Sequence, residues 1–243
     1  MDGSNFNEFV IKVIEALKSD RAWLFFTPNP EMIVKAQTDD YFKTVLNAGD
    51  VNVCDGFGLY LAARWKGYRV SRLTGMDCLF ILAAIAARTQ RRIFLLGSGE
   101  EITIVKAARR LLQKLPNLPL CGYDKGPVIV ENKENKLVIG TVESDSLEKK
   151  IIEARPEILV VGFGMGKQEK WIYENAAKFP SVRIVIGVGG AFDYVSGKVP
   201  RAPLLMRKFG LEWVYRLFKQ PHRAGRIFDA TVRFIWLVIT SKK

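Results

Sequence analysis

The hydrophobic positions along the chain follow two spacings that alternate with one another. Between residues 6 and 17 they recur every three or four residues, as on one face of a helix, and residues 22–26 then form a short apolar run. Further apolar runs at 92–96, 158–161 and 183–188 are dense enough to be central strands of a parallel sheet. Because helical spacing separates these runs, the pattern predicts an α/β fold, with a mostly parallel, Rossmann-like sheet and helices on both faces.

The intervals between the runs are predicted to be helical, with one exception. Helical patterns continue to about residue 48, cover 59–66, 79–88 and 104–115, and lead from residue 147 into the run at 158. The exception is residues 118–135, where Gly122, Gly126 and Pro127 indicate a loop. Within it, residues 128–130 fit either a short strand or the start of a helix.

The last fifth of the chain differs in character, so we divide the sequence into a sheet domain, residues 1–195, and a helical basic appendage, residues 196–243. The appendage carries eleven basic residues against two acidic ones, which is nine of the twelve net positive charges. Such a localised charge predicts an anionic partner. Prolines at 200, 203 and 221 separate two stretches with helical spacing, 204–218 and 227–239.

The pattern of this appendage fits three interpretations. Arginines mixed with aromatic residues are typical of a helix that lies in the headgroup region of an anionic membrane. Two ordinary helices docked on the sheet domain would show the same spacing. Single-stranded nucleic acid also binds basic and aromatic residues, but residues 234–239 are too continuously apolar for a solvated groove, so we expect no nucleic acid partner.

Composition limits the remaining classes. The 243 residues suffice for one large domain with an appendage. Cys54, Cys78 and Cys121 are far apart in apolar surroundings and predict reduced thiols in a cytosolic protein, and the first residues lack a secretory signal. No run reaches the roughly 18 apolar residues of a membrane span. His222 is the single histidine, so a histidine-based metal site is not expected, and no cofactor is predicted.

Asp55 is the most informative candidate for chemistry. It follows the short apolar run 51–53 and precedes Gly56 and a helical pattern, so it is predicted at the carboxyl end of a strand. Ligands of open α/β sheets bind at that edge. A carboxylate there is either a general base or simply the N-cap of the next helix, and the two roles are compatible.

Other strand ends carry polar or glycine-rich segments. Thr27 and Asn29 follow the first run, the segment 97–100 follows the third, and 162–169 and 189–193 follow the last two. A glycine turn before a helix offers backbone N–H groups to a phosphate. The spacing of a dinucleotide-binding G-x-G-x-x-G motif and that of a P-loop are both missing, and no Asp-x-Asp pair is present to hold a divalent ion on a diphosphate. Arginines, lysines or backbone amides would therefore neutralise a bound diphosphate.

Several of these segments together resemble the WecG/TagA/CpsF glycosyltransferases, in particular the TagA branch. The resemblance runs in order over nearly the whole chain, and its motifs are Thr27-Pro-Asn-Pro-Glu31, Cys54-Asp-Gly-Phe-Gly58, Arg72-Leu-Thr-Gly75, Phe94-Leu-Leu-Gly97, Gly162-Phe-Gly-Met-Gly-Lys-Gln-Glu169, Gly187-Val-Gly-Gly-Ala-Phe-Asp193, Arg201-Ala-Pro203, Gly210-Leu-Glu-Trp-Val-Tyr-Arg216 and Pro221-His-Arg223. The chain departs from the family pattern at three places: Cys54 stands where members commonly carry Ala, Gly166 stands where they commonly carry Pro, and residues 118–135 fit the pattern poorly.

The resemblance implies an inverting, metal-independent transfer of N-acetylmannosamine. The donor would be UDP-N-acetylmannosamine, and the acceptor undecaprenyl-diphospho-N-acetylglucosamine, joined through a β-1,4 bond in the synthesis of the wall teichoic acid linkage unit. Residues 1–195 would be the catalytic domain, and the appendage would associate with the anionic inner face of the cell membrane, which implies a cytoplasmic, peripheral protein. The sequence does not decide the oligomeric state, and a homo-oligomer is one of the open alternatives.

The resemblance also suggests roles for individual residues. Asp55 would be the base, and Thr27 and Asn29 would position the sugar or the acceptor. Four residues would contact the nucleotide sugar: Gly97, Gln168, Glu169 and Asp193. Three arginines of the appendage would hold a diphosphate: Arg216, Arg223 and Arg226. Arg72 is a further candidate cation, although a surface ion pair explains it as well, and turn or cap duty remains an alternative for the other side chains.

Two other functions stay open on the sequence. One is a transferase of the same fold that uses another donor, such as the UDP derivative of N-acetylmannosaminuronic acid or glucose. The other is a non-enzymatic, peripheral module that binds a membrane or nucleic acid. The second would show strongly salt-dependent binding and no loss on neutralising Asp55.

Overall fold

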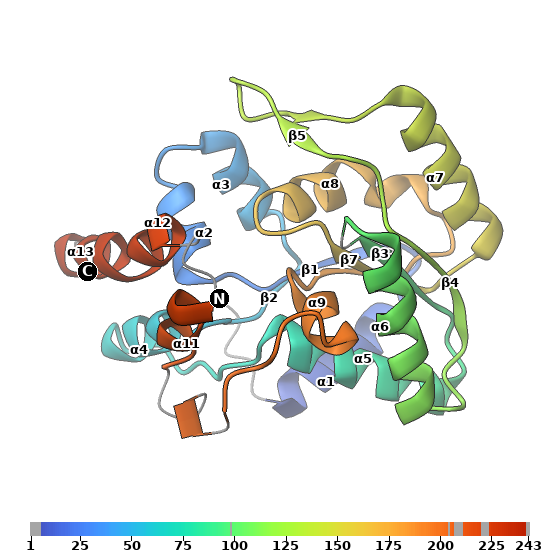
Figure 1. Ribbon diagram of the computed structural model, residues 1–243, viewed down its shortest axis with the longest axis horizontal. Helices are drawn as coiled ribbons and strands as arrows, with labels where there is room; N and C mark the ends of the chain where they lie inside the picture. Colours follow the sequence, from blue (N-terminus) through green and yellow to red (C-terminus); the bar gives the residue numbers. More distant parts are fainter. Residues whose placement is uncertain (1–5, 98, 204, 207–210, 220–223, 242–243) are drawn as a thin grey trace.

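The computed structural model describes residues 6–97, 99–203, 205–206, 211–219 and 224–241, and for Arg216 and Lys219 the backbone alone (Figure 1). A six-stranded parallel sheet forms the centre, with strand order β2-β1-β8-β7-β3-β4. Its strands are β1 (Trp23–Phe26), β2 (Val51–Asn52), β3 (Ile93–Gly97), β4 (Leu120–Asp124), β7 (Ile158–Gly162) and β8 (Ile184–Gly187). The predicted α/β fold with a mostly parallel sheet is confirmed.

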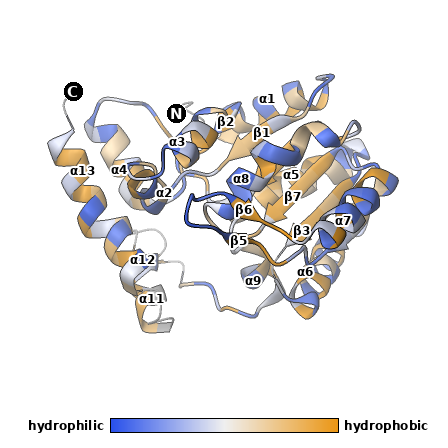
Figure 2. Cartoon of the chain, turned by 90° about the horizontal axis from the view of Figure 1, so that it is seen from above, coloured by the Kyte–Doolittle hydropathy of each residue, from blue (hydrophilic) through white to orange (hydrophobic). Residues whose placement is uncertain are grey.

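Helices cover both faces of this sheet (Figures 1 and 2). Along the sheet they are α1 (Phe6–Leu17), α2 (Pro30–Lys35), α3 (Asp40–Asn47), α4 (Phe57–Trp65), α5 (Gly75–Thr89), α6 (Glu101–Lys114), α7 (Thr141–Ala154), α8 (Lys167–Asn175) with the 3₁₀ turn η1 (Ala176–Lys178), and α9 (Ala191–Ser196). Helix α7 begins six residues before the position at which the sequence pattern placed it. Its first turns are polar and exposed, so apolar periodicity marks only the later part.

Alternate residues of the strands feed two separate cores. Phe25, Leu95 and Val160 point to the face covered by α1, α5, α6 and α9, and their neighbours Phe26 and Leu96 point to the face covered by α2, α3, α7 and α8. Both layers are fully buried, because a central strand of a parallel sheet has an apolar partner on each side. This explains why the strands appear in the sequence as continuous apolar runs.

Strand β4 was missed by the sequence pattern, which indicated a loop there. Its residues are half-buried rather than continuously buried, because β4 is the edge strand beside β3. Gly122 suggested a turn, but it lies in the strand and faces the Phe94 ring, where a Cβ atom would approach that ring to 2.5 Å. The glycine therefore serves close packing. Beyond β4 the chain forms an antiparallel hairpin of β5 (Val130–Glu131) and β6 (Leu137–Val138), so residues 128–130 lead into a strand.

The C-terminal helices lie beside α2 and α4, away from the sheet (Figure 1). They are α11 (Glu212–Lys219) and a longer helical stretch made of α12 (Ala224–Phe228), the π-helical turn η3 (Asp229–Arg233) and α13 (Phe234–Thr240). Phe234 is 3 % exposed and packs with Cys54 and Leu59 in a third, small cluster. Within the described ranges, none of the helices combines the length and hydrophobicity needed to span a bilayer. The division at residue 196 stays a prediction.

Candidate active site

The carboxyl ends of the parallel strands open into one polar cavity of about 530 Å³. Segments that follow β1, β2, β7 and β8 line it, together with the segment between β4 and β5. The chain passes from β1 outward to β2, whereas β8 and β7 lie on the other side of β1. Loops diverge where the strand order reverses, and open α/β sheets bind their ligands in that crevice.

Asp55 lies in the wall of this cavity, and its backbone is fixed from two sides. Its N–H donates to the Pro28 carbonyl at 2.8 Å, and the carbonyl of Cys54 accepts from Leu73 N–H at 3.1 Å. The N-cap of α4 is Gly56, with φ of +88° and no side-chain cap. Asp55 therefore lies one residue before the N-cap position of α4. The left-handed backbone of Gly56, which residues with a Cβ rarely adopt, turns the chain immediately after the carboxylate.

Thr27 and Asn29, after β1, have structural partners as well as places in the cavity wall. The Thr27 hydroxyl donates to the Gly187 carbonyl at 3.0 Å and so ties the end of β1 to that of β8. The Oδ1 atom of Asn29 accepts from Met32 N–H at 3.1 Å and caps α2. Asn29 thus has the cap duty considered as its alternative, whereas Thr27 joins two strand ends, and both contacts orient the side chains at the cavity.

Gln168 and Glu169, at the start of α8, have different positions. Gln168 lines the cavity, and its Oε1 accepts from Gly189 N–H at 2.9 Å. Its Nε2 donates to Glu169 at 2.6 Å, and Glu169 also accepts from Gly166 N–H at 2.7 Å. Glu169 itself is completely buried and does not reach the cavity. We conclude that Glu169 orients Gln168, and the predicted direct contact between Glu169 and a nucleotide sugar is not supported by this geometry.

Burial has a large effect on Glu169. Desolvation raises the pKa of its carboxyl to about 7, although the hydrogen bonds from Gln168 and Gly166 act in the opposite direction. The raised pKa means that ionisation of Glu169 opposes folding as the pH rises from the acidic range toward neutrality.

Lysines hold the β5–β6 hairpin, which follows the cavity-lining segment after β4. Lys170 is fully buried, and its Nζ donates to Asp39 at 2.8 Å, to Glu131 at 2.8 Å and to the Asn135 carbonyl at 2.6 Å. Lys35 Nζ donates to the same Glu131 at 2.8 Å. Burial pushes the pKa of Glu131 upward, but the hydrogen bonds from Lys170 and Lys35 outweigh it, so the pKa lies below its ordinary value. These contacts fasten the β5–β6 hairpin to α2, α3 and α8.

Four basic side chains lie in the wall of the cavity: Lys125, Lys167, Arg201 and Arg226. Sequence reasoning selected only Arg226 among them. Lys167 Nζ donates to the Ile129 carbonyl at 2.6 Å, and Arg201 lies 3.5 Å from Asp77. Their positions in the segments Gly166-Lys167-Gln168 and Arg201-Ala-Pro could have marked Lys167 and Arg201, whereas Lys125 falls in the stretch without a clear pattern. Among the described residues, no group of three or more His, Cys, Asp and Glu side chains is arranged to hold a metal ion.

A second, apolar cavity of about 830 Å³ adjoins the polar one between α2, α4 and the C-terminal helices. Both cavities are lined by Asn29, Glu31, Asp55, Thr74, Glu212 and Arg226. Asp55 thus stands where a polar compartment meets an apolar one.

Comparison with known proteins agrees with this geometry. The sequence profile of the glycosyl transferase WecG/TagA/CpsF family matches residues 1–243. The chain belongs to this family of glycosyltransferases. A relative from Bacillus subtilis is 34% identical over 84% of this chain and 74% of its own length, and one from Staphylococcus aureus is 29% identical over 96% and 86%. A third, from Bacillus spizizenii, is 29% identical over 88% and 77%. All three are named N-acetylglucosaminyldiphosphoundecaprenol N-acetyl-beta-D-mannosaminyltransferase.

Membership of the WecG/TagA/CpsF family confirms the resemblance and the prediction of a glycosyltransferase, and it decides against a non-enzymatic module. Within this family member, the polar cavity brings together six of the predicted site residues: Thr27, Asn29, Asp55, Gln168, Asp193 and Arg226. Their individual roles stay predictions.

The other predicted site residues lie elsewhere. Gly97 has φ of +109°, and a Cβ there would come within 2.8 Å of the Gly162 backbone, so its absent side chain lets β3 and β7 end close together. Arg72 lines the apolar cavity rather than the polar one, with its guanidinium 5.9 Å from the centre of the Phe57 ring. The Arg216 side chain and the whole of Arg223 lie outside the described residues.

Proposed function

We propose that this glycosyltransferase moves N-acetylmannosamine from UDP-N-acetylmannosamine to undecaprenyl-diphospho-N-acetylglucosamine, with inversion and a β-1,4 bond, as a step in building the wall teichoic acid linkage unit. The polar and apolar cavities meet at Asp55, and we call this junction the seam. The observation that carries the proposal is the agreement between this junction and the substrate in the names of the relatives. An acceptor that joins a sugar to a polyprenol needs a polar and an apolar compartment side by side.

In this mechanism Asp55 is the general base. Its carboxylate takes the proton of the acceptor hydroxyl while that oxygen attacks the anomeric carbon, and the bond from this carbon to UDP breaks on the opposite side. A single displacement of this kind inverts the anomeric centre. The fixed backbone on both sides of Asp55 holds the carboxylate in place during the transfer.

The leaving UDP needs positive charge near its diphosphate. Lys125, Lys167 and Arg201 lie in the polar cavity and are suited to this role. Arg226 lies in the wall of both cavities and pairs with Glu31, with 3.1 Å between Nη2 and Oε2. We assign Arg226, together with Arg216 and Arg223, to the diphosphate of the donor or of the lipid acceptor. If Arg226→Gln leaves the KM values of both substrates unchanged, this assignment of Arg226 is wrong.

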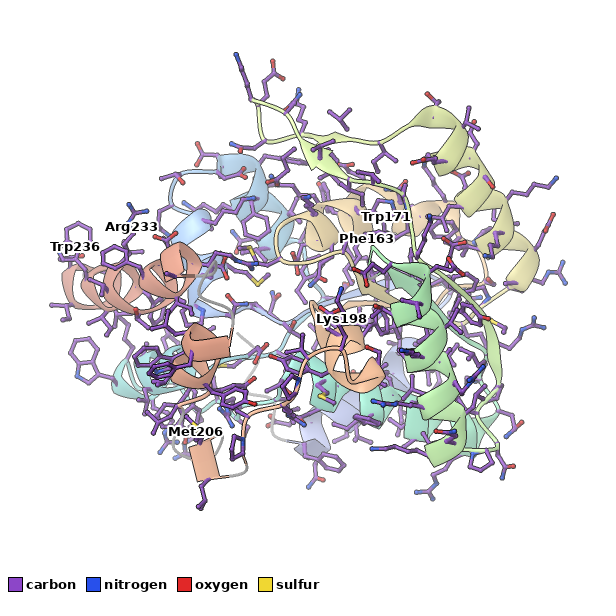
Figure 3. All side chains as sticks on the ribbon, in the orientation of Figure 1. Phe163, Trp171, Lys198, Met206, Arg233 and Trp236 are labelled. Carbon is purple, nitrogen blue, oxygen red and sulfur yellow. The ribbon has the colours of Figure 1, made fainter. Side chains whose placement is uncertain are left out.

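We also propose that the protein acts as a peripheral protein on the inner face of the cell membrane. The described part of the C-terminal stretch exposes Phe218, Phe228, Ile235, Trp236 and Ile239. Trp236 and Arg233 project at the outer end of these helices, far from the sheet (Figure 3). Exposed aromatic and basic side chains on one helix favour binding to an anionic bilayer.

The transfer is tested by measuring UDP release from UDP-N-acetylmannosamine with the lipid-linked acceptor in the presence of EDTA. A positioned base contributes about 10²- to 10⁴-fold, so Asp55→Asn should lower kcat by at least about a hundredfold. The exposed Asp145 on α7 provides a matched control, since Asp145→Asn changes the same group away from the cavities. Near-normal turnover by a folded Asp55→Asn variant would exclude the role of base. Turnover lost in EDTA and restored by a divalent cation would exclude a metal-independent reaction.

A further inference from the structure

The apolar cavity has the form of a groove between two helices that are tied together. Its walls are the α4 side chains Leu61 and Trp65 and the C-terminal side chains Ile227, Ile235, Val238 and Ile239. The buried Phe234 and Pro30 lie at its base. At one end, Lys66 Nζ donates to the Ser241 carbonyl at 3.0 Å and joins the end of α4 to the end of α13. The groove is therefore formed by the way the C-terminal helix packs beside α4.

One end of the groove is polar and coincides with the seam. Asn29, Asp55 and Arg226 line both cavities, and Arg72 lines the groove beside them. Arg72 and Arg226 supply the positive charge of this end, which also holds Glu31, the ion-pair partner of Arg226, and Glu212; the lining further along the groove is largely apolar. A ligand that fits this arrangement has an anionic head at the seam and a hydrocarbon chain that extends along the helices.

We propose that the groove binds the proximal isoprene units of the acceptor's polyprenyl chain, the units next to its diphosphate. This inference rests on the proposed function. It adds where the polyprenyl chain of the acceptor binds and which residues contact it. Burial of a hydrocarbon chain against these side chains stabilises the complex roughly in proportion to the apolar area removed from water. With the chain in the groove and the diphosphate near Arg72 and Arg226, the acceptor sugar is directed toward Asp55 and the polar cavity.

Chain recognition in the groove is distinct from membrane attachment. Leu61 and Ile235 line the groove and are 49% and 56% exposed, so they can be replaced without opening a core. Trp236 is the neighbour of Ile235 and is 65% exposed, but it is not part of the groove lining. A general apolar membrane face would use Trp236 at least as much as Leu61, whereas a chain-binding groove would not use it.

The test is the binding of farnesyl diphosphate and of inorganic diphosphate to the full chain, measured by titration calorimetry without detergent or vesicles. We expect farnesyl diphosphate to bind at least about tenfold more tightly than inorganic diphosphate, and Leu61→Ser/Ile235→Ser to raise the Kd of farnesyl diphosphate by about tenfold. Inorganic diphosphate should bind the double variant as it binds the unmodified protein. Trp236→Ser, the matched control, should leave both Kd values unchanged.

Three results would overturn the proposal. The first is equal affinity for the two diphosphates. The second is an equal effect of Trp236→Ser and the double variant, which would indicate a general membrane face. The third is a double variant that changes the sedimentation behaviour of the protein but not its affinity for farnesyl diphosphate, which would make the groove a contact between two copies of the chain.

The experiments distinguish an error in the groove assignment from an error in the proposed transfer reaction. Calorimetry needs no turnover, so farnesyl diphosphate can bind in the groove even if UDP-N-acetylmannosamine is the wrong donor. Conversely, if transfer occurs but its KM is the same for acceptors with a farnesyl chain and with a methyl group, the transferase assignment stands and the groove assignment is wrong.

Discussion

The two cavities that meet at Asp55 are built in different ways. The polar cavity is framed by strand ends and loops that are crosslinked by buried hydrogen bonds, such as those of Thr27, Gln168 and Glu169. The apolar groove is framed by helices that dock through a small cluster around Phe234. A rigid frame suits a sugar nucleotide, whose polar groups need fixed partners, whereas a hydrocarbon chain needs only an apolar surface of the right shape.

This difference indicates that the two compartments can be perturbed separately. Loss of a buried polar contact should affect the frame of the polar cavity and the stability of the whole domain. Loss of an apolar contact in the C-terminal helices should affect the groove and leave the sheet intact. The predictions below test this separation.

The largest effect is expected at the buried ion network behind the polar cavity. Lys170→Met leaves Asp39 and Glu131 without their buried partner, and removing one member of such a network costs about 3–5 kcal/mol in the free energy of unfolding. Lys178→Met is the matched control, because Lys178 makes an exposed pair with Glu148, worth at most about 1 kcal/mol. Denaturant unfolding measures both. Equal losses would show that the network does not hold the hairpin in place.

The next effect is expected at the base of the groove. Phe234→Ser removes the buried ring that docks the C-terminal helix, so transfer to the undecaprenyl acceptor should fall by about a hundredfold. The affinity for UDP, measured by calorimetry, should stay within about threefold, since Lys125, Lys167 and Arg201 of the polar cavity lie outside the C-terminal helices and Arg226 is placed at the acceptor diphosphate. Phe6→Ser removes an exposed ring from α1, away from both cavities, and serves as the control. Loss of UDP binding in Phe234→Ser would contradict the separation of the two compartments.

The smallest effect concerns Glu169 and the pH. Its pKa is raised by burial to about 7, so the native state holds this proton in a range where the unfolded chain has released it. The contribution of Glu169 to stability is complete below its unfolded pKa and is lost as the pH rises through about 7.

Between pH 5 and 8 the free energy of unfolding of the unmodified protein should therefore fall by about 2 kcal/mol more than that of Glu169→Gln, which has no carboxyl group to titrate at this position. The measurement is denaturant unfolding at several pH values. Parallel pH profiles for the two proteins would show that Glu169 does not titrate in this range.

Part of the site could be predicted from the sequence, because strand ends are visible in the apolar pattern. The apolar pattern singled out Asp55 and the segments 162–169 and 189–193, and the family resemblance then selected Gln168 and Asp193 within those segments; all three residues line the polar cavity. Lys125 was missed because its segment has no apolar period, and Arg201 because it lies in an irregular connection. The burial of Glu169 could not be predicted, since the residue lies one position from the exposed wall of a cavity.

The sequence by itself determined the alternation of strands and helices, the carboxylate after the second strand, the basic C-terminal stretch and the family. These features depend on local spacing and on the order of motifs, which a single chain displays directly. Only the tertiary structure decided that Gly122 packs on Phe94, that Lys170 bridges Asp39 and Glu131, and that Phe234 closes a groove beside α4. Each of these contacts joins residues far apart in the chain, and a buried polar or aromatic group finds its partner only when the sheet has brought those segments together.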